Sequence, residues 1–159
     1  MTRYAEGTSV SVEKSRAEIE TTLTRYGATA FVYGWEGARA LIEFKAKGRR
    51  IRFVLPLPER GERRFTHSRR GNSSFETLLS SDAGSKAWEQ ACRQTWRALA
   101  LVIKAKLEAV ATGIAEFEDE FLANIVLPEG DTVSQRIRPT IAIAYENNGS
   151  PPLLLDYVR

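Results

Sequence analysis

The sequence predicts an α+β domain with an N-terminal helix, a three-stranded antiparallel β-meander, a long amphipathic helix packed on one sheet face, and short C-terminal helices. Two observations predict this order. Three short segments with alternating apolar side chains follow one another with turns between them, and one long apolar stripe at helical spacing comes after them. A run of strands followed by helices is typical of α+β proteins. With 159 residues, 43% of them hydrophobic, the chain fits a single domain over 1–159.

The first helix is predicted over residues 11–26. Ser11 can cap its N-terminus, and the apolar side chains of Ile19, Leu23 and Tyr26 repeat at helical spacing. Gly27 follows directly, and it favours termination because glycine adopts the left-handed backbone that ends many helices.

Three strands are predicted over 28–33, 38–45 and 49–55, with turns at 34–37 and 47–48. Alternation in the last two strands places an apolar row on one face: Ala40, Ile42, Phe44, Ile51, Phe53 and Leu55. The opposite face then carries a polar and basic row: Glu43, Lys45, Arg50 and Arg52. We expect the apolar face to be buried and the basic face to be exposed. Pro56 ends the sheet, because proline cannot donate to a ladder.

Residues 59–84 show no apolar period and predict a flexible basic loop, since long irregular stretches are functional or disordered. After it, Ser85 can cap a long helix that ends near Thr112. The apolar stripe of this helix predicts packing on the sheet, and it consists of Trp88, Cys92, Trp96, Leu99, Ile103, Leu107 and Val110. A second row is basic and should face outward: Lys86, Gln90, Arg93, Arg97 and Lys104.

Two short helices are predicted near the C-terminus. The first covers 116–124 and is anchored by Phe117 and Phe121. Thr132 and Gln135 have the spacing of a capping box for the second, which ends near Asn147. Pro139 should kink or restart that helix, and 148–159 should be an irregular tail.

Basic residues are concentrated in residues 45–70, where ten Lys and Arg stand against two Glu, a net charge of +8. The whole chain carries +3, so the other residues sum to −5. Such segregation is typical of proteins that bind a polyanion, most often nucleic acid. The alternative is a solvated loop that keeps the protein soluble.

We therefore predict binding to nucleic acid, with DNA favoured and little sequence specificity, because lysine and arginine contact phosphates. The predicted contacts are Lys45, Lys47, Arg49, Arg50, Arg52, Arg63, Arg64, Arg69, Arg70, Arg93 and Arg97. Three nearby aromatic residues could stack on unpaired bases: Trp35, Phe65 and Phe75.

An alternative is a Mg²⁺-dependent nuclease. Glu43 and Lys45 lie two residues apart on one strand face, as in metal-dependent nucleases with an α-β-β-β-α core, where the carboxylate holds the metal. The acid that usually precedes this pair is missing, and Glu36 is the nearest one. An ion pair across strands explains Glu43 equally well. We therefore assign no catalytic residue.

Other candidate sites favour structural roles. The acidic run of Glu116, Glu118, Asp119 and Glu120 is typical of a solvated helix side that could pair with the basic segment. His67 has no acid beside it to orient it as a base, and Cys92 lies on the apolar stripe. One histidine and one cysteine cannot build a structural zinc site, so we expect no metal and no cofactor.

A second class of function is a protein-interaction module that docks on a host protein with the same basic face. Self-association is also expected, because a free sheet edge and the apolar residues Leu153, Leu154 and Leu155 invite pairing. No apolar run is long enough to span a bilayer, and the N-terminus has no signal-peptide core. We expect a cytoplasmic protein without a membrane partner.

Four segments resemble a family of small proteins of tailed phages and mobile elements that has no assigned activity. The segments are RYGATAFVYGW (25–35), IRFVLPLP (51–58), RQTWRALALVIKAKLEAV (93–110) and FEDEFLANIVLPEGDTV (117–133). The resemblance implies a protein made in the cytoplasm of a bacterial host, and it brings no catalytic residue. The element order alone is similar to that of phage single-strand annealing proteins, which bind single-stranded DNA in a basic groove.

Overall fold

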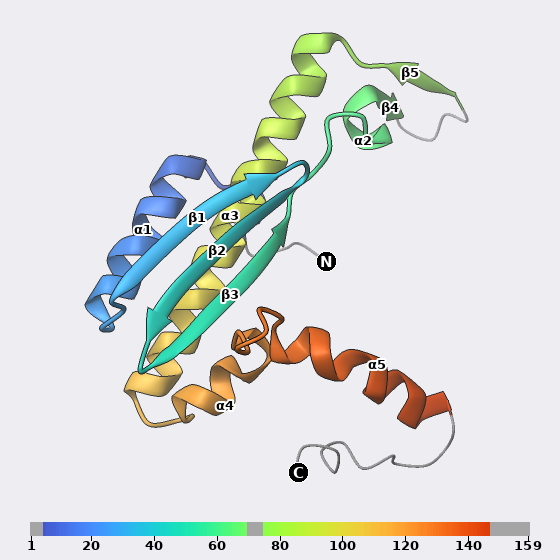
Figure 1. Cartoon of the computed structure of the whole chain (residues 1–159). Coiled ribbons are helices and arrows are strands. Elements are labelled where there is room, and N and C mark those ends of the chain that lie inside the picture. Colours follow the sequence, from blue (N-terminus) through green and yellow to red (C-terminus); the bar gives the residue numbers. More distant parts are fainter. Residues whose placement is uncertain (1–4, 70–74, 147–159) are drawn as a thin grey trace.

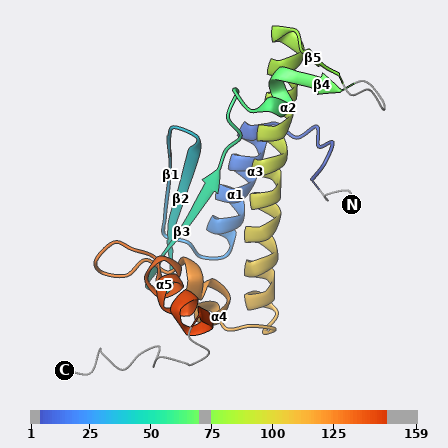
Figure 2. The same ribbon diagram turned by 90° about the vertical axis from the view of Figure 1, so that its right-hand side faces the viewer.

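A three-stranded sheet and two helices packed on one of its faces form the body of the molecule (Figures 1 and 2). The structure is a computed structural model, and it describes residues 5–69 and 75–146. The predicted α+β architecture is confirmed. The sheet contains β1 (Ala30–Glu36), β2 (Arg39–Ala46) and β3 (Arg49–Pro56), and α1 (Val12–Arg25) and α3 (Ser81–Ala111) cover its buried face.

Helix α1 begins and ends at the predicted signals. The Lys14 N–H donates to Ser11 Oγ at 3.2 Å, which caps the N-terminus. Gly27 follows the last turn with φ +85°, a left-handed conformation that glycine adopts without strain.

The register of the sheet confirms the two predicted faces. Ile42 pairs with Phe53 and is buried, whereas Glu43 pairs with Arg52 and Lys45 with Arg50 on the open face. The turn at Lys47 and Gly48 is also confirmed, with both residues at positive φ, as a two-residue hairpin turn requires.

The first turn differs from the prediction. Strand β1 continues through Trp35, which pairs with Ala40, and the chain reverses at Gly37 and Ala38 instead of over 34–37. Gly34 therefore lies within a strand, where glycine is uncommon but tolerated at an edge. Aromatic residues such as Trp35 favour strands, which agrees with the longer strand.

One hydrophobic core joins the sheet to the helices. Phe44 and Phe121 meet edge to face with ring centroids 5.9 Å apart, and Trp96 packs against Tyr33 at 6.0 Å. The members of this core include Ile19, Leu23, Ile42, Phe44, Ile51, Trp96, Ile103, Leu107, Phe117 and Phe121. The core therefore contains residues from α1, the sheet, α3 and the C-terminal elements.

The predicted flexible loop over 59–84 is wrong for most of its described length. It contains the short helix α2 (Arg63–Thr66), a hairpin of β4 (His67–Arg69) and β5 (Glu76–Leu78), and the first turn of α3. Ser80 caps α3 by accepting from the Ala83 N–H at 3.3 Å, so α3 begins earlier than Ser85. A sequence without apolar period can still fold when it packs on a neighbour, and here one buried residue, Phe65, does so.

The C-terminal elements extend the sheet edge. Helix α4 (Phe117–Phe121) and the 3-10 helix η1 (Leu122–Asn124) lead to an isolated bridge between Ile125 and Ile51 of β3. Helix α5 (Val133–Glu146) starts at the predicted capping box, with the Thr132 N–H donating to Gln135 Oε1 at 2.8 Å. It runs through Pro139 as one helix, so the predicted restart is wrong.

Two predictions lie outside the described residues, those on Arg70 and on the tail 148–159 with Leu153–Leu155. Within 5–69 and 75–146, no helix has the length and apolar character that crossing a bilayer requires.

Candidate nucleic-acid interface

The basic segment 45–70 is continuous in the sequence but separates into two clusters in space (Figure 1). We call the first the sheet-end cluster, which lies around the β2–β3 turn and comprises Lys45, Lys47, Arg49, Arg50 and Arg52. We call residues 59–69 and 75–78, which contain α2, β4 and β5, the ribbon. Its cluster comprises Arg60, Arg63, Arg64 and Arg69. The eight residues of β3 run from the β2–β3 turn toward the ribbon and span about 25 Å, since a strand rises about 3.3 Å per residue.

A carboxylate organises the sheet-end cluster. Glu43 accepts hydrogen bonds from Nε of Arg50 and from Nε of Arg52, both at 2.9 Å. Burial works against ionisation of Glu43, but these hydrogen bonds outweigh it, and the pKa of the carboxyl lies below its ordinary value. Two arginines therefore share one negative charge.

Arg52 is a structural residue more than a surface cation. Its Nη1 donates to the Gly130 carbonyl at 2.7 Å, and its own carbonyl accepts from the Asn124 side-chain amide at 3.0 Å. Its side chain is only 20% exposed. Arg52 therefore ties β3 to the C-terminal segment and contributes little free charge.

The remaining cations of the sheet-end cluster differ in whether a carboxylate pairs with them. Arg49 forms an ion pair with Glu118 at 2.6 Å, which places the predicted acidic run against the basic segment. Lys45 and Lys47 have no carboxylate within ion-pair distance among residues 5–69 and 75–146. Lys45 is exposed and lies directly opposite Arg50 on the open face. Five cations against Glu43 and Glu118 leave an excess of three positive charges.

The ribbon cluster is more exposed but better neutralised. Arg63 donates to Glu76 at 2.7 Å, Arg69 lies 3.7 Å from the same carboxylate, and the side chain of Arg63 is 76% exposed. The hydrogen bond from Arg63 lowers the pKa of Glu76. Arg64 pairs with Glu62 at 2.7 Å. With Glu59 also present, four arginines stand against three acids, an excess of one charge.

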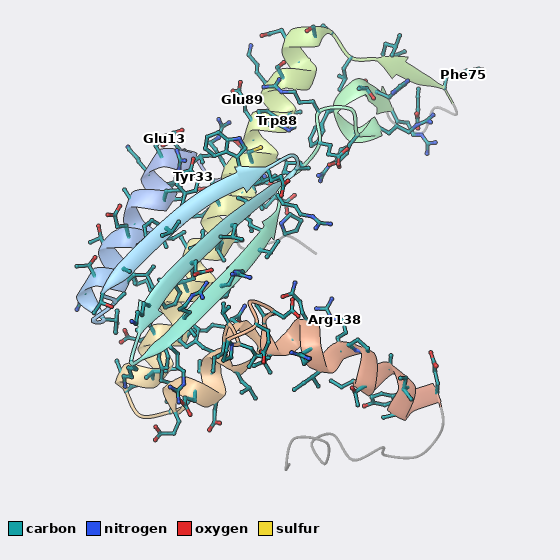
Figure 3. The ribbon with its side chains drawn as sticks, viewed as in Figure 1. Glu13, Tyr33, Phe75, Trp88, Glu89 and Arg138 are labelled. Carbon is teal, nitrogen blue, oxygen red and sulfur yellow. The ribbon has the colours of Figure 1, made fainter. Side chains whose placement is uncertain are left out.

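Aromatic and close backbone contacts attach the ribbon to α3. The guanidinium of Arg60 lies 3.8 Å from the ring centroid of Trp88, whose Nε1 donates to the Pro58 carbonyl at 2.7 Å (Figure 3). A Cβ on Gly84 would lie 2.4 Å from the Phe65 carbonyl oxygen, so only glycine permits this approach. Trp88 was expected in the core and is half-buried instead.

Arg93 and Arg97 do not join either cluster. Arg97 forms an ion pair with Glu18 of α1, and Nη2 of Arg93 donates to Gln90 Oε1 at 2.6 Å. Both therefore lie in the helical layer, on the other side of the sheet from Lys45 and Arg50 (Figure 2). The predicted extension of the basic surface onto α3 is not formed.

The three aromatic candidates for base stacking are scattered. Phe65 is buried and holds the ribbon on α3, so it cannot stack on a base. Trp35 is exposed at the far end of β1 and packs on Tyr33, with ring centroids 5.9 Å apart. Phe75 is exposed at the outer end of the ribbon (Figure 3). None of them borders the sheet-end cluster.

The geometry favours the ion-pair interpretation of Glu43 over metal binding. Both carboxylate oxygens already accept from arginines. In the described part of the chain, no three residues of the types His, Cys, Asp and Glu are grouped closely enough to hold a metal ion. Glu120 of the acidic run pairs with Lys106 at 2.8 Å.

The candidates His67 and Cys92 occupy structural positions. Nδ1 of His67 lies 2.9 Å from Thr66 Oγ1, a contact within the ribbon. Cys92 is buried as predicted, and burial raises the pKa of its thiol.

Sequence reasoning missed Glu76, which pairs with two ribbon arginines but lies outside the basic segment, and Gly84, which was assigned to a loop. Two acids carried a signal. Alternation placed Glu43 and Arg52 on one face, and the acidic run that contains Glu118 was predicted as a possible partner of the basic segment.

Comparison of the chain with models of protein families, with curated proteins and with solved structures found no match. The resemblance to phage proteins therefore stays a prediction.

Proposed function

We propose that this protein is a nucleic-acid-binding accessory protein that contacts the phosphates of DNA with little sequence preference through the sheet-end cluster. The observation that carries the proposal is the rung of Lys45 and Arg50, two exposed cations directly opposite each other on adjacent strands. Like charges in that position destabilise a sheet, and Glu43, which Arg50 shares with Arg52, offsets only part of the repulsion. A bound phosphate would relieve the rest.

The charge balance supports the sheet-end cluster over the ribbon. Its excess of three positive charges follows from Lys45 and Lys47, which lack carboxylate partners in the described chain, and from the sharing of Glu43 by two arginines. The ribbon arginines would have to give up Glu76 and Glu62 before they could bind a phosphate. Helices α1 and α3 leave the open sheet face uncovered above the C-terminal elements (Figure 2).

The chemistry of the contacts supports weak sequence dependence. Lysine and arginine on a strand and a tight turn bind the backbone, which fixes position but carries no base identity. The resemblance to phage proteins brings no activity, and it implies only a location in the cytoplasm of a bacterial host.

The test is fluorescence-anisotropy binding to labelled single-stranded and duplex DNA at two salt concentrations. Lys45→Gln with Lys47→Asn removes two charges and keeps the turn, because asparagine accepts the positive φ of position 47. We expect about tenfold weaker binding and a salt slope smaller by about 2, since each lost phosphate contact lowers the slope by about 1.

Arg63→Gln with Arg69→Gln is the matched control, because it also removes two charges from the basic segment. We expect less than half of the loss in slope. Equal losses in the two variants, or binding that salt does not weaken, would contradict the proposal.

A further inference from the structure

The open face of the sheet carries a group of apolar residues next to the sheet-end cluster. Alternation in the three strands places them on this face, and we call them the apolar strip: Val32, Gly34, Leu41 and Val54. Gly34 pairs with Leu41, and Leu41 pairs with Val54, so three of the four form one row across the sheet. Val32 is 60% exposed and Val54 is 51% exposed, and the described helices leave the strip uncovered (Figures 1 and 2). An exposed apolar surface on a charged face indicates a contact site.

Gly34 has no explanation in the packing of the described chain. The register continues from Tyr33 to Trp35 without a bulge, and the backbone of Gly34 lies outside the left-handed region. A Cβ at this position would meet no atom within 4 Å. Glycine weakens a strand, and a remaining reason for its presence is the close approach of a ligand. The missing side chain leaves a bare area beside Leu41 that a planar group can reach.

Positive charges lie at both ends of the apolar strip. The rung of Lys45 and Arg50 lies toward the β2–β3 turn, and Arg39 lies six steps from Lys45 along β2, about 20 Å away. Arg39 is exposed, and no carboxylate of residues 5–69 and 75–146 lies within ion-pair distance of it.

Acids on the same face reduce this charge without cancelling it. Glu36 is opposite Arg39 in the register, and Glu43 is held by Arg50 and Arg52. The open face therefore has four cations against two acids, an excess of two positive charges: Arg39, Lys45, Arg50 and Arg52 against Glu36 and Glu43. A ligand with negative charges along its length is complementary to this face.

Such a ligand must also offer planar apolar surfaces to the strip. A single-stranded nucleic acid has both features, because its unpaired bases expose their ring faces and its backbone carries phosphates. A duplex keeps the ring faces inside its stack and offers only base edges in its grooves. The strip therefore favours a single strand over a duplex.

We propose that the apolar strip binds unpaired bases of single-stranded DNA, whose phosphates contact the rung of Lys45 and Arg50 on one side and Arg39 on the other. The inference rests on the proposed function. It adds the type of strand and two further contact positions, Gly34 and Arg39.

The experiment measures anisotropy with three labelled probes of equal length: a single strand of thymidines, an abasic single strand and a duplex. The native chain should bind the thymidine strand about fivefold to tenfold more tightly than the abasic strand, because the strip buries apolar base surface. The abasic strand keeps the phosphates, so both single strands should show salt-dependent binding.

Gly34→Val is the decisive variant, because its side chain fills the bare area and changes no charge. Its Cβ has open space, so the fold should persist, and circular dichroism checks it. Affinity for the thymidine strand should fall about fivefold to tenfold, to the level of the abasic strand, with an unchanged salt slope. Binding of the abasic strand and of the duplex should stay as in the native chain.

Gly61→Val is the matched control. Gly61 also has open space around its Cβ position and lies outside the left-handed region, but it belongs to the ribbon. This variant should bind all three probes as the native chain does. Arg39→Gln tests the second phosphate contact and should lower the salt slope for the single strand by about 1.

The outcomes separate this inference from the function on which it rests. A native chain without salt-sensitive DNA binding would overturn both. Salt-sensitive binding that does not distinguish the thymidine strand from the abasic strand, or that Gly34→Val leaves unchanged, would overturn this inference alone. Light scattering tests another occupant of the strip. A native chain that dimerises while Gly34→Val stays monomeric would assign the strip to a second copy and overturn the inference.

Discussion

The sheet-end cluster and the ribbon cluster come from one basic segment but differ in how their charges are used. At the sheet end, two lysines lack acids in the described chain and two arginines share Glu43. In the ribbon, Glu62 and Glu76 hold three arginines, and the fourth stacks on Trp88. The more exposed cluster therefore has the smaller excess charge. Exposure of cations does not by itself indicate a polyanion site. The carboxylates that pair with the cations determine how much positive electrostatic potential remains at the surface.

The largest effect in this comparison should come from the anchor of the ribbon. Phe65→Ala removes the one buried side chain of α2 and should cost about 3–5 kcal/mol, the usual range for a buried Phe. The loss should appear as faster hydrogen exchange at the Leu79 amide, which donates to the Thr66 carbonyl at 2.8 Å. DNA binding should change little if the sheet end is the contact surface.

Phe75→Ala is the control for this change. It removes the same side chain from a position that is 81% exposed, so stability should change by less than about 0.5 kcal/mol. A large loss of DNA affinity in Phe65→Ala with intact folding of the sheet would move the contact surface to the ribbon.

An intermediate effect is expected for Glu43→Gln. The change leaves Arg50 and Arg52 without their shared carboxylate, and Arg52 is largely buried, so stability should fall by about 1–3 kcal/mol. The same variant raises the positive charge of the sheet-end cluster, and DNA affinity should increase. Chemical denaturation measures the change in stability, and anisotropy measures the change in DNA affinity. A lower affinity would contradict the prediction that Glu43 limits phosphate binding at the sheet-end cluster.

The pH dependence of stability tests the same carboxylate. Because the pKa of Glu43 is lower in the folded state, its contribution is present above the unfolded value of 4.5 and is lost as pH falls through the folded value. Stability of the native chain should therefore decline in this acid range more steeply than that of Glu43→Gln. Parallel declines would show that Glu43 is not coupled to folding.

The smallest effect should follow Glu76→Gln. The ion pairs of Glu76 with Arg63 and Arg69 lie at the surface, where solvent screens them, so they contribute little to stability. The variant increases the excess charge of the ribbon from one to two, and we expect a small gain in salt-dependent DNA binding. A gain larger than that of Glu43→Gln would reverse the ranking of the two clusters.

The sequence by itself determined the elements whose signals are local. Ser11 and the Thr132–Gln135 box fixed helix starts, and alternation through Ile42, Glu43 and Phe44 fixed the faces of the sheet. These signals depend on side chains a few residues apart, so they can be read without knowledge of distant contacts. The sequence also identified the sheet-end lysines as candidate phosphate contacts.

Only the tertiary structure decided the ribbon, the start of α3 and the balance of charge. The ribbon folds because Phe65 and Gly84, nineteen positions apart, meet at α3. Hydrophobic periodicity cannot predict a contact between residues so far apart in the sequence. The charge balance depends on ion pairs such as Arg49–Glu118, whose partners are brought together by packing of α4 against the sheet end. Coulomb interactions act across space and not along the chain, so a net charge counted in sequence cannot give the field at a surface.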